Sequence, residues 1–186
     1  VSSDFLDQAT LTYAASLPDT FQAYMGAYAG YSYARSMNRD AAARQLLDVK
    51  GWRTETREYQ SAVYTQMTIG GGAPEAEKML DSLLPTYGKD PVWLTAIGDA
   101  YANARGVKFG MGRKFYRMAL DVAPAYRPAY VNLLKLAVAK GEYREAINAI
   151  DSFKQTGPMT PELTFLHAQA LVGVGRVDEG IAQFKQ

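Results

Sequence analysis

The sequence predicts an all-α fold, on three observations. Capping residues stand directly before proline at Asp90-Pro91 and Thr160-Pro161, a pattern that begins helices. Segments of about 12 to 16 residues, the length of ordinary globular helices, lie between regular breaks. No segment shows the sustained alternation expected of a strand. The breaks contain glycine, proline or asparagine, and they fall at Met37-Asn38, Gly70 to Gly72, Gly106 to Gly112, Gly141, Gly157-Pro158 and Gly173 to Gly175.

The composition excludes several classes of function. The chain has 186 residues, of which 48% are hydrophobic and 21% charged, and its formal net charge is +1. This charge gives no global field that attracts nucleic acid, so we expect no nucleic-acid partner. The absence of cysteine excludes disulfides, thiol catalysis and cysteine-ligated zinc. The uncharged run from Thr20 to Ala34 is shorter than the ~18 residues that suggest a membrane span, so we expect none in this segment.

Two helices are expected at the beginning of the chain. Phe5, Leu6, Ala9 and Tyr13 recur at helical spacing, which predicts a helix within residues 1–22 that covers the segment after it. The segment 23–35 places Tyr24, Tyr28, Tyr31 and Arg35 on one side of a helix, with glycines and alanines around another. We interpret the small residues as a packing seam and the tyrosines as candidates for contact with a partner.

Later segments repeat one another. Leu94 to Tyr101, Arg117 to Pro124, Gly141 to Ile147 and Gly175 to Phe184 resemble parts of the tetratricopeptide repeat, which pairs two antiparallel helices, A and B. The resemblance implies an α-α superhelix, a solenoid of such pairs with about 34 residues in each repeat. Extending that register predicts repeats at 23–56, 57–90, 91–126 and 127–160, with an incomplete repeat at 161–186. The third repeat has about two extra residues in its turn, which places Gly112 at its twentieth position.

The positions at which helices A and B cross closely support this register. The twentieth position of every repeat is glycine or alanine, and a large apolar residue follows four positions later in each. The eighth position, which the family also keeps small, holds Gly30, Tyr64, Gly98, Leu134 and Ala168, so Tyr64 and Leu134 depart from the pattern. The last repeat stops inside a helix B without a polar cap. We therefore expect the chain to continue beyond Gln186 and the open C-terminal face to allow self-association.

Residues with catalytic potential are sparse, so we predict no enzyme, no metal and no cofactor. The only histidine, His167, stands where the family has a buried leucine, and we expect it to be a hydrogen-bonded interior or edge residue. Lys108, Arg113 and Lys114 lie in a glycine-rich segment without the spacing of a phosphate-binding loop. This segment is either an enlarged turn with a solvated basic rim or a contact for an anionic partner.

The resemblance also implies a concave groove lined by the A helices, in which a protein or peptide segment binds. Its lining positions predict a set of groove residues: Tyr24, Tyr31, Arg35, Thr65, Thr95, Asp99, Asn103, Val131, Lys135, Phe165 and Gln169. The carboxylate clamp of chaperone-binding relatives is missing, because only Asn132 agrees with it, and this disfavours a chaperone co-adaptor. The chain's own N-terminal helix is an alternative occupant of part of the groove.

From the resemblance we predict a non-catalytic scaffold for protein–protein interaction. The expected setting is a larger bacterial envelope assembly, such as secretion, pilus or polysaccharide export, with periplasm or cell envelope favoured over cytoplasm. Two alternatives stay open at this point. In the first alternative the chain is an accessory module of a larger enzyme, and in the second its aromatic groove binds a glycan.

Overall fold

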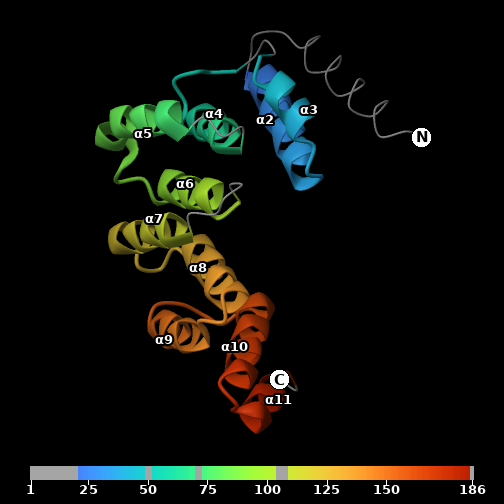
Figure 1. Cartoon of the computed structure of the whole chain (residues 1–186), viewed down its shortest axis with the longest axis vertical. Coiled ribbons are helices and arrows are strands. Elements are labelled where there is room, and N and C mark those ends of the chain that lie inside the picture. Colours follow the sequence, from blue (N-terminus) through green and yellow to red (C-terminus); the bar gives the residue numbers. More distant parts are fainter. Residues whose placement is uncertain (1–20, 49–51, 70–72, 104–108, 185–186) are drawn as a thin grey trace, which may run out of the picture. The chain divides into compact units, whose positions relative to one another are not determined.

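The computed structural model describes residues 21–48, 52–69, 73–103 and 109–184, which form ten helices and no strand (Figure 1). The all-α prediction is confirmed, while the helix predicted within residues 1–22 lies almost entirely outside the described residues. The helices are α2 (Phe21–Ser36), α3 (Asp40–Leu46), α4 (Arg57–Ile69), α5 (Ala73–Tyr87), α6 (Pro91–Asn103), α7 (Phe109–Val122), α8 (Arg127–Ala139), α9 (Tyr143–Lys154), α10 (Pro161–Gly173) and α11 (Val177–Phe184).

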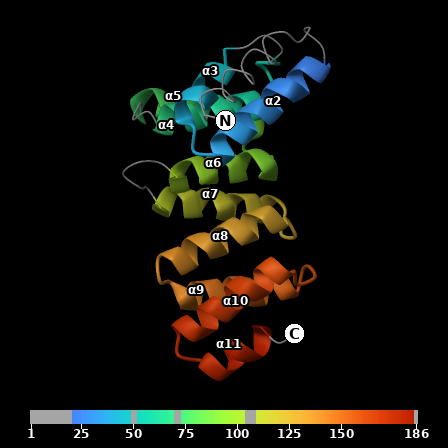
Figure 2. The same cartoon turned by 90° about the vertical axis from the view of Figure 1, so that its right-hand side faces the viewer.

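The chain divides into two compact units, Val1–Ser82 and Leu83–Gln186, and α5 runs across the boundary. In the second unit the helices pack in pairs, α6 with α7, α8 with α9 and α10 with α11, and they follow one another as layers (Figure 2). Helix α8 also contacts both α6 and α10, so the first helices of the three pairs lie side by side. The division into repeats by residue number stays a prediction.

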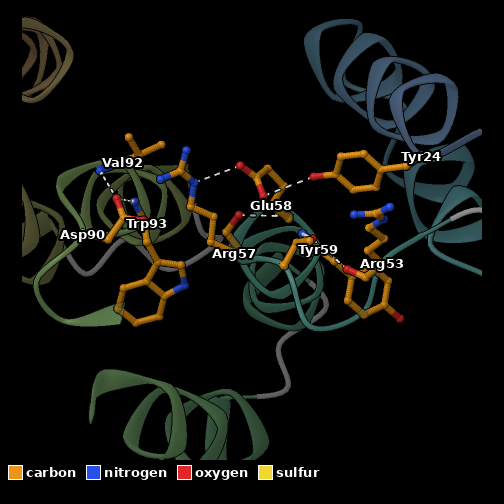
Figure 3. Close-up of polar contacts among 10 residues, drawn as sticks. Tyr24, Arg53, Arg57, Glu58, Tyr59, Asp90, Val92 and Trp93 are labelled. Atoms are coloured by element: carbon orange, nitrogen blue, oxygen red, sulfur yellow. Dashed lines mark hydrogen bonds and ion pairs between the residues drawn. The ribbon is translucent and has the colours of Figure 1, made fainter. Parts of the chain in front are cut away.

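Two helices of the second unit begin with the predicted caps. The Asp90 carboxylate accepts hydrogen bonds from the backbone N–H groups of Val92 (2.9 Å) and Trp93 (3.3 Å), ahead of α6 (Figure 3). The Thr160 hydroxyl accepts from the N–H of Leu163 at 3.4 Å, ahead of α10. These side chains satisfy N–H groups that have no partner inside the helix, which is why each helix starts where it does.

Three of the turns between paired helices share one geometry. Asn38, Gly141 and Gly175 have positive φ angles of 56°, 73° and 85°. In each case the next residue's N–H donates 2.9 Å to a carbonyl five residues earlier, which is the Schellman arrangement. Glycine adopts this conformation without strain and asparagine tolerates it, so these breaks in the sequence are the turns that reverse the chain.

Small residues hold the paired helices close together. A Cβ atom on Gly112 of α7 would lie 3.1 Å from the carbonyl oxygen of Gly98 in α6. A Cβ atom on Gly180 of α11 would lie 3.0 Å from the carbonyl oxygen of Ala168 in α10. These are the eighth and twentieth positions of the predicted register, which therefore meet across the helix pair. Tyr64, which departs from the small-residue pattern at the eighth position, is fully buried in the first unit.

Trp52 organises the core of the first unit. Helix α3 has only seven residues, and the indole N–H of Trp52 donates to the carbonyl oxygen of Leu46 at its end, at 2.7 Å. The indole ring contacts the rings of Tyr24, Tyr28 and Tyr31 of α2 edge-on and that of Tyr59 of α4 at a tilt. One buried indole thus closes the end of α3 and joins α2 to α4.

Candidate functional site

The two tyrosines predicted as partner anchors lie in the core of the first unit. Tyr24 is 8% exposed and Tyr31 is 7% exposed, and burial raises the pKa of both hydroxyls. The Tyr24 hydroxyl donates to Glu58 of α4 at 3.1 Å, and the Tyr31 hydroxyl donates to the carbonyl oxygen of Ala62 at 3.2 Å. Both side chains therefore join α2 to α4 within the chain instead of presenting a surface to a partner.

The other predicted groove residues of this unit also bond within the chain. Arg35 forms an ion pair with Asp40, and the Thr65 hydroxyl donates to the carbonyl oxygen of Ser61 at 2.8 Å. Glu58 accepts from Tyr24 and from Arg57, and both dashed contacts are drawn in Figure 3. Burial alone would raise the pKa of Glu58, but its hydrogen bonds, chiefly the one from Arg57, outweigh burial and lower it.

In the second unit, polar side chains of α6, α8 and α10 gather on one surface, which we call the A-face. It is defined by Asp99, Asn132, Lys135 and Glu162. The Asp99 carboxylate accepts from the Tyr116 hydroxyl and from the Asn132 amide, both at 2.7 Å. Burial raises the pKa of Asp99 against the opposing effect of these donors and of Lys135. Burial and the nearby Asp99 charge raise the pKa of Tyr116 as well.

The A-face continues from α8 to α10 through one ion pair. The Lys135 ammonium lies 2.7 Å from a Glu162 carboxylate oxygen, and both side chains are exposed. An exposed pair of this kind contributes only about 0–1 kcal/mol to stability. Beside it lies a hollow of about 260 Å³ between α6 and α8, lined by Asp99, Ala102, Tyr116, Asn132, Lys135, Leu136 and Ala139.

The remaining predicted groove residues of this unit differ in how exposed their side chains are. Thr95 and Val131, at the fifth position of their repeats, are buried, and the Thr95 hydroxyl donates to the carbonyl oxygen of Pro91 at 2.7 Å. Phe165, at the same position in the last pair, is half exposed, and Gln169 is partly buried. Asn103 is the last residue of α6, at the edge of the described part of the structure.

The predicted basic contact for an anionic partner, at Lys108, Arg113 and Lys114, lies only partly within the described residues. Lys108 lies outside the described residues, and Lys114 is exposed. The Arg113 guanidinium forms ion pairs with Glu142 and, at 3.1 Å, with Glu145. The hydrogen bond from Arg113 is the main cause that lowers the pKa of Glu142. Two carboxylates of the same chain thus compensate the Arg113 charge, and binding of an anion to this guanidinium would have to displace them.

The described residues offer no metal-binding cluster. His167 is buried in α10, and burial, followed by the Lys154 charge, lowers its pKa. Its Nδ1 atom has no hydrogen-bond partner in the described part of the chain. No group of three histidine, aspartate or glutamate side chains that could hold a metal occurs there. Within the same residues, every helix is too short or too polar to cross a membrane.

Known structures resemble this chain throughout its length. TTC0263, a thermophilic TPR protein in Thermus thermophilus, has a TM-score of 0.55 and 17% identity over 96% of this chain and 88% of its own. MamA has a TM-score of 0.54 and 16% identity over 96% of this chain and 90% of its own. A second MamA structure, AMB-1, has a TM-score of 0.55 and 17% identity over 84% and 91%.

The fold is that of tetratricopeptide repeat proteins. At this level of identity the likeness establishes the fold alone. No protein-family model matches the sequence, and no curated protein matches it.

The sequence did not predict the core position of Trp52 or the hydrogen bonds that Tyr116 and Asn132 donate to Asp99. The only signal for Trp52 was a large aromatic residue in an otherwise polar segment before α4.

Proposed function

We propose that this chain is a non-catalytic scaffold that binds a protein segment on the A-face of its second unit. The observation that carries the proposal is the hollow between α6 and α8. Apolar Ala102, Leu136 and Ala139 line it, and the charged groups of Asp99 and Lys135 border it. A hollow of this kind accepts one apolar side chain, while its border selects for charge in the neighbouring residues.

The charges of the A-face favour a partner segment with both signs. Asp99, Lys135 and Glu162 alternate in charge from α6 through α8 to α10. An acidic side chain of the partner would replace Glu162 at Lys135, and a basic one would replace Lys135 at Glu162. This exchange of partners costs little free energy because the Lys135–Glu162 pair is solvent-exposed. We also propose that the chain works within a larger bacterial envelope assembly, because repeat arrays of this kind are often components of such assemblies.

Selection from a displayed peptide library tests the A-face directly. Selected peptides would be measured against the wild-type chain, Lys135→Ala and Lys154→Ala. Lys154 is a matched control because it is also exposed and also pairs with a carboxylate, Asp151, but lies on α9. We expect Lys135→Ala to weaken binding several-fold and Lys154→Ala to leave it unchanged. Equal affinities for all three chains would show that the A-face is not the binding surface.

A further inference from the structure

A further hollow lies between α7 and α9, with α8 as its floor. Its volume is about 420 Å³, and both α7 and α9 pack against α8. Arg117 of α7 and Glu145 of α9 lie at its rim and form an ion pair. Its apolar lining comes from all three helices and consists of Leu120, Tyr130, Leu133 and Ala149. We call the surface formed by these six residues the B-groove.

The B-groove is apolar at its base and polar at its rim. Tyr130 and Leu133 are buried, and Leu120 and Ala149 are partly buried. The Arg117 side chain is 58% exposed. A hollow of this size, with an apolar base and a few polar groups at its border, has the composition of a binding site for an apolar group.

The next helix pair lacks such an apolar base. The residues one repeat length, about 34 positions, after Leu120, Leu133 and Ala149 are Lys154, His167 and Gln183. These three side chains lie together between α9 and α11. Burial and then the Lys154 charge lower the pKa of His167, and a hydrogen bond with Gln183 acts in the opposite direction. The apolar base is therefore a property of this one place and not of the repeat in general.

The ion pairs at the rim allow Arg117 to change its partner. Glu145 pairs with Arg117 and also with Arg113, whose Nη1 atom lies 3.1 Å away. If Arg117 turned to a new carboxylate, Arg113 would still compensate Glu145, and an exposed pair costs little to exchange. A new cation would have to compete with two guanidinium groups for Glu145. Lys114 and Asp121, about one turn before and after Arg117, have opposite charges, so the rim favours an acidic group.

We infer that the B-groove binds a segment of a partner protein that carries a large apolar side chain close to a carboxylate. The apolar side chain would lie on Leu120, Leu133 and Ala149. The carboxylate would accept hydrogen bonds from the Arg117 guanidinium. All six residues of the B-groove belong to α7, α8 and α9, so the site is complete within the described part of the second unit. It is a surface other than the A-face, and the inference does not depend on the proposed function.

Few of the chain's own remaining segments have this chemistry. The residues outside the described ranges are 1–20, 49–51, 70–72, 104–108 and 185–186. Of these, only 1–20 contains a carboxylate beside a large apolar residue, as in Asp4-Phe5. This segment and any residues that follow Gln186 in the natural polypeptide are the competing occupants from the same chain. A second copy of the chain is the competing occupant from outside it.

Selection from a displayed library of short random peptides provides the probes. Peptides that bind wild type and also Lys135→Ala would be kept, which sets aside binders of the A-face. Their affinities for Arg117→Ala and Ala149→Gln would be measured by fluorescence anisotropy. The glutamine would fill the hollow, and α11 already has glutamine at the equivalent position. Arg176→Ala is the matched control, because Arg176 is exposed and also pairs with a glutamate but precedes α11.

We expect the selected peptides to share a large apolar residue with Asp or Glu within one helical turn of it. Ala149→Gln should weaken their binding at least about tenfold, because the hollow is filled. Arg117→Ala should weaken it several-fold and remove its salt dependence, while Arg176→Ala should leave it unchanged. A peptide whose acidic residue is replaced by lysine should prefer Arg117→Glu to wild type. The absence of such peptides, or equal affinities for wild type and Ala149→Gln in variants that circular dichroism shows to be folded, would overturn the inference.

Cross-linking separates a partner segment from the other occupants. The sequence contains no cysteine, so Ser152→Cys, at the edge of the B-groove, can carry a single benzophenone label. The polypeptide encoded by the natural gene would be labelled there, with any cysteine outside these residues changed to serine, and irradiated with a selected peptide. We expect a cross-link to the peptide. A cross-link to residues of the same chain outside α7, α8 and α9 would identify the chain's own segment as the occupant, whether it precedes or follows these helices. A product of twice the mass would identify a second copy, and either result would overturn the inference.

Discussion

Replacing Gly98 by alanine should destabilise the second unit, although alanine is the better helix former. Gly98 lies inside α6, and a Cβ atom there would stand 2.5 Å from Cε1 of Tyr116 and 3.2 Å from the carbonyl oxygen of Gly112. The Tyr116 ring is buried, and its hydroxyl donates to Asp99 at 2.7 Å. The ring therefore has to move, and its movement strains the hydrogen bond that fixes Asp99 on the A-face.

The expected magnitude follows from three opposing effects. Alanine gains about 1 kcal/mol over glycine in helix propensity. Overpacking costs about 1–3 kcal/mol. Loss of the hydrogen bond from Tyr116 to the Asp99 carboxylate would cost about 1.5–3 kcal/mol more. The free energy of unfolding should therefore fall by about 1 kcal/mol if the bond survives and by about 3 kcal/mol if it breaks, and each kcal/mol lowers Tm by about 2–4 °C in a chain of this size.

Urea unfolding followed by circular dichroism measures this change. Gly110→Ala is the control, because Gly110 lies in the first turn of α7 and a Cβ atom there meets no atom within 4 Å. That variant should be as stable as wild type or more stable by up to about 1 kcal/mol. If Gly98→Ala matched the stability of Gly110→Ala, the close crossing of α6 and α7 would be refuted, and with it the reason for small residues at these positions.

Three further predictions concern other parts of the fold. Wild type should lose stability as pH falls below about 6.5, because the lowered pKa of His167 means that the unfolded chain takes up the proton first. His167→Leu should flatten that dependence in urea midpoints between about pH 7.5 and pH 5, and an unchanged slope would exclude this histidine as its source. Trp52→Ala should lower the free energy of unfolding by about 3–5 kcal/mol, since a large buried ring is removed. A loss below about 1 kcal/mol in the same urea titration would contradict its central place in the first unit. Gly175→Ala should cost about 1–2 kcal/mol because φ is +85° there. Asn38→Gly should cost nothing measurable in thermal melts, and a clear loss would argue against the shared turn geometry.

The features predicted correctly from sequence are those set by local rules. Asp90 and Thr160 cap helices because their side chains reach N–H groups two or three residues away. Gly141 and Gly175 mark turns because few other residues adopt positive φ. Gly98 and Gly112 mark a helix crossing because a Cβ atom on either would lie only 3.1–3.2 Å from the carbonyl oxygen of the other. Each of these inferences needs only a short stretch of chain or one pair of helices, so the sequence was sufficient.

The side-chain environment of the candidate groove could not be predicted in the same way. Tyr24 and Tyr31 are buried because α3 ends after seven residues and Trp52 then packs against α2. The repeat pattern gave no sign of this shortening, since Ala42 and Leu46 both fit it. Asp99 is held by donors from α7 and α8, Tyr116 and Asn132, whose pairing depends on how three helices meet. Such contacts join residues far apart in sequence, and no local pattern encodes them.

Whether a residue at a given repeat position faces solvent depends on the helix that follows it. The family pattern assigns the fifth position to the groove, yet Val131 is buried in a cluster with α10, and Phe165 at the same position is half exposed. Val131 and Phe165 differ less in chemistry than in their neighbours. Within the described residues another helix pair follows the pair that contains Val131, and none follows the pair that contains Phe165. The same comparison relates Val138, Tyr143 and Ile147 to Val172, Val177 and Ile181. The exposure of a residue at a given repeat position is thus set by the neighbouring helix pair, and the residue type alone does not determine it.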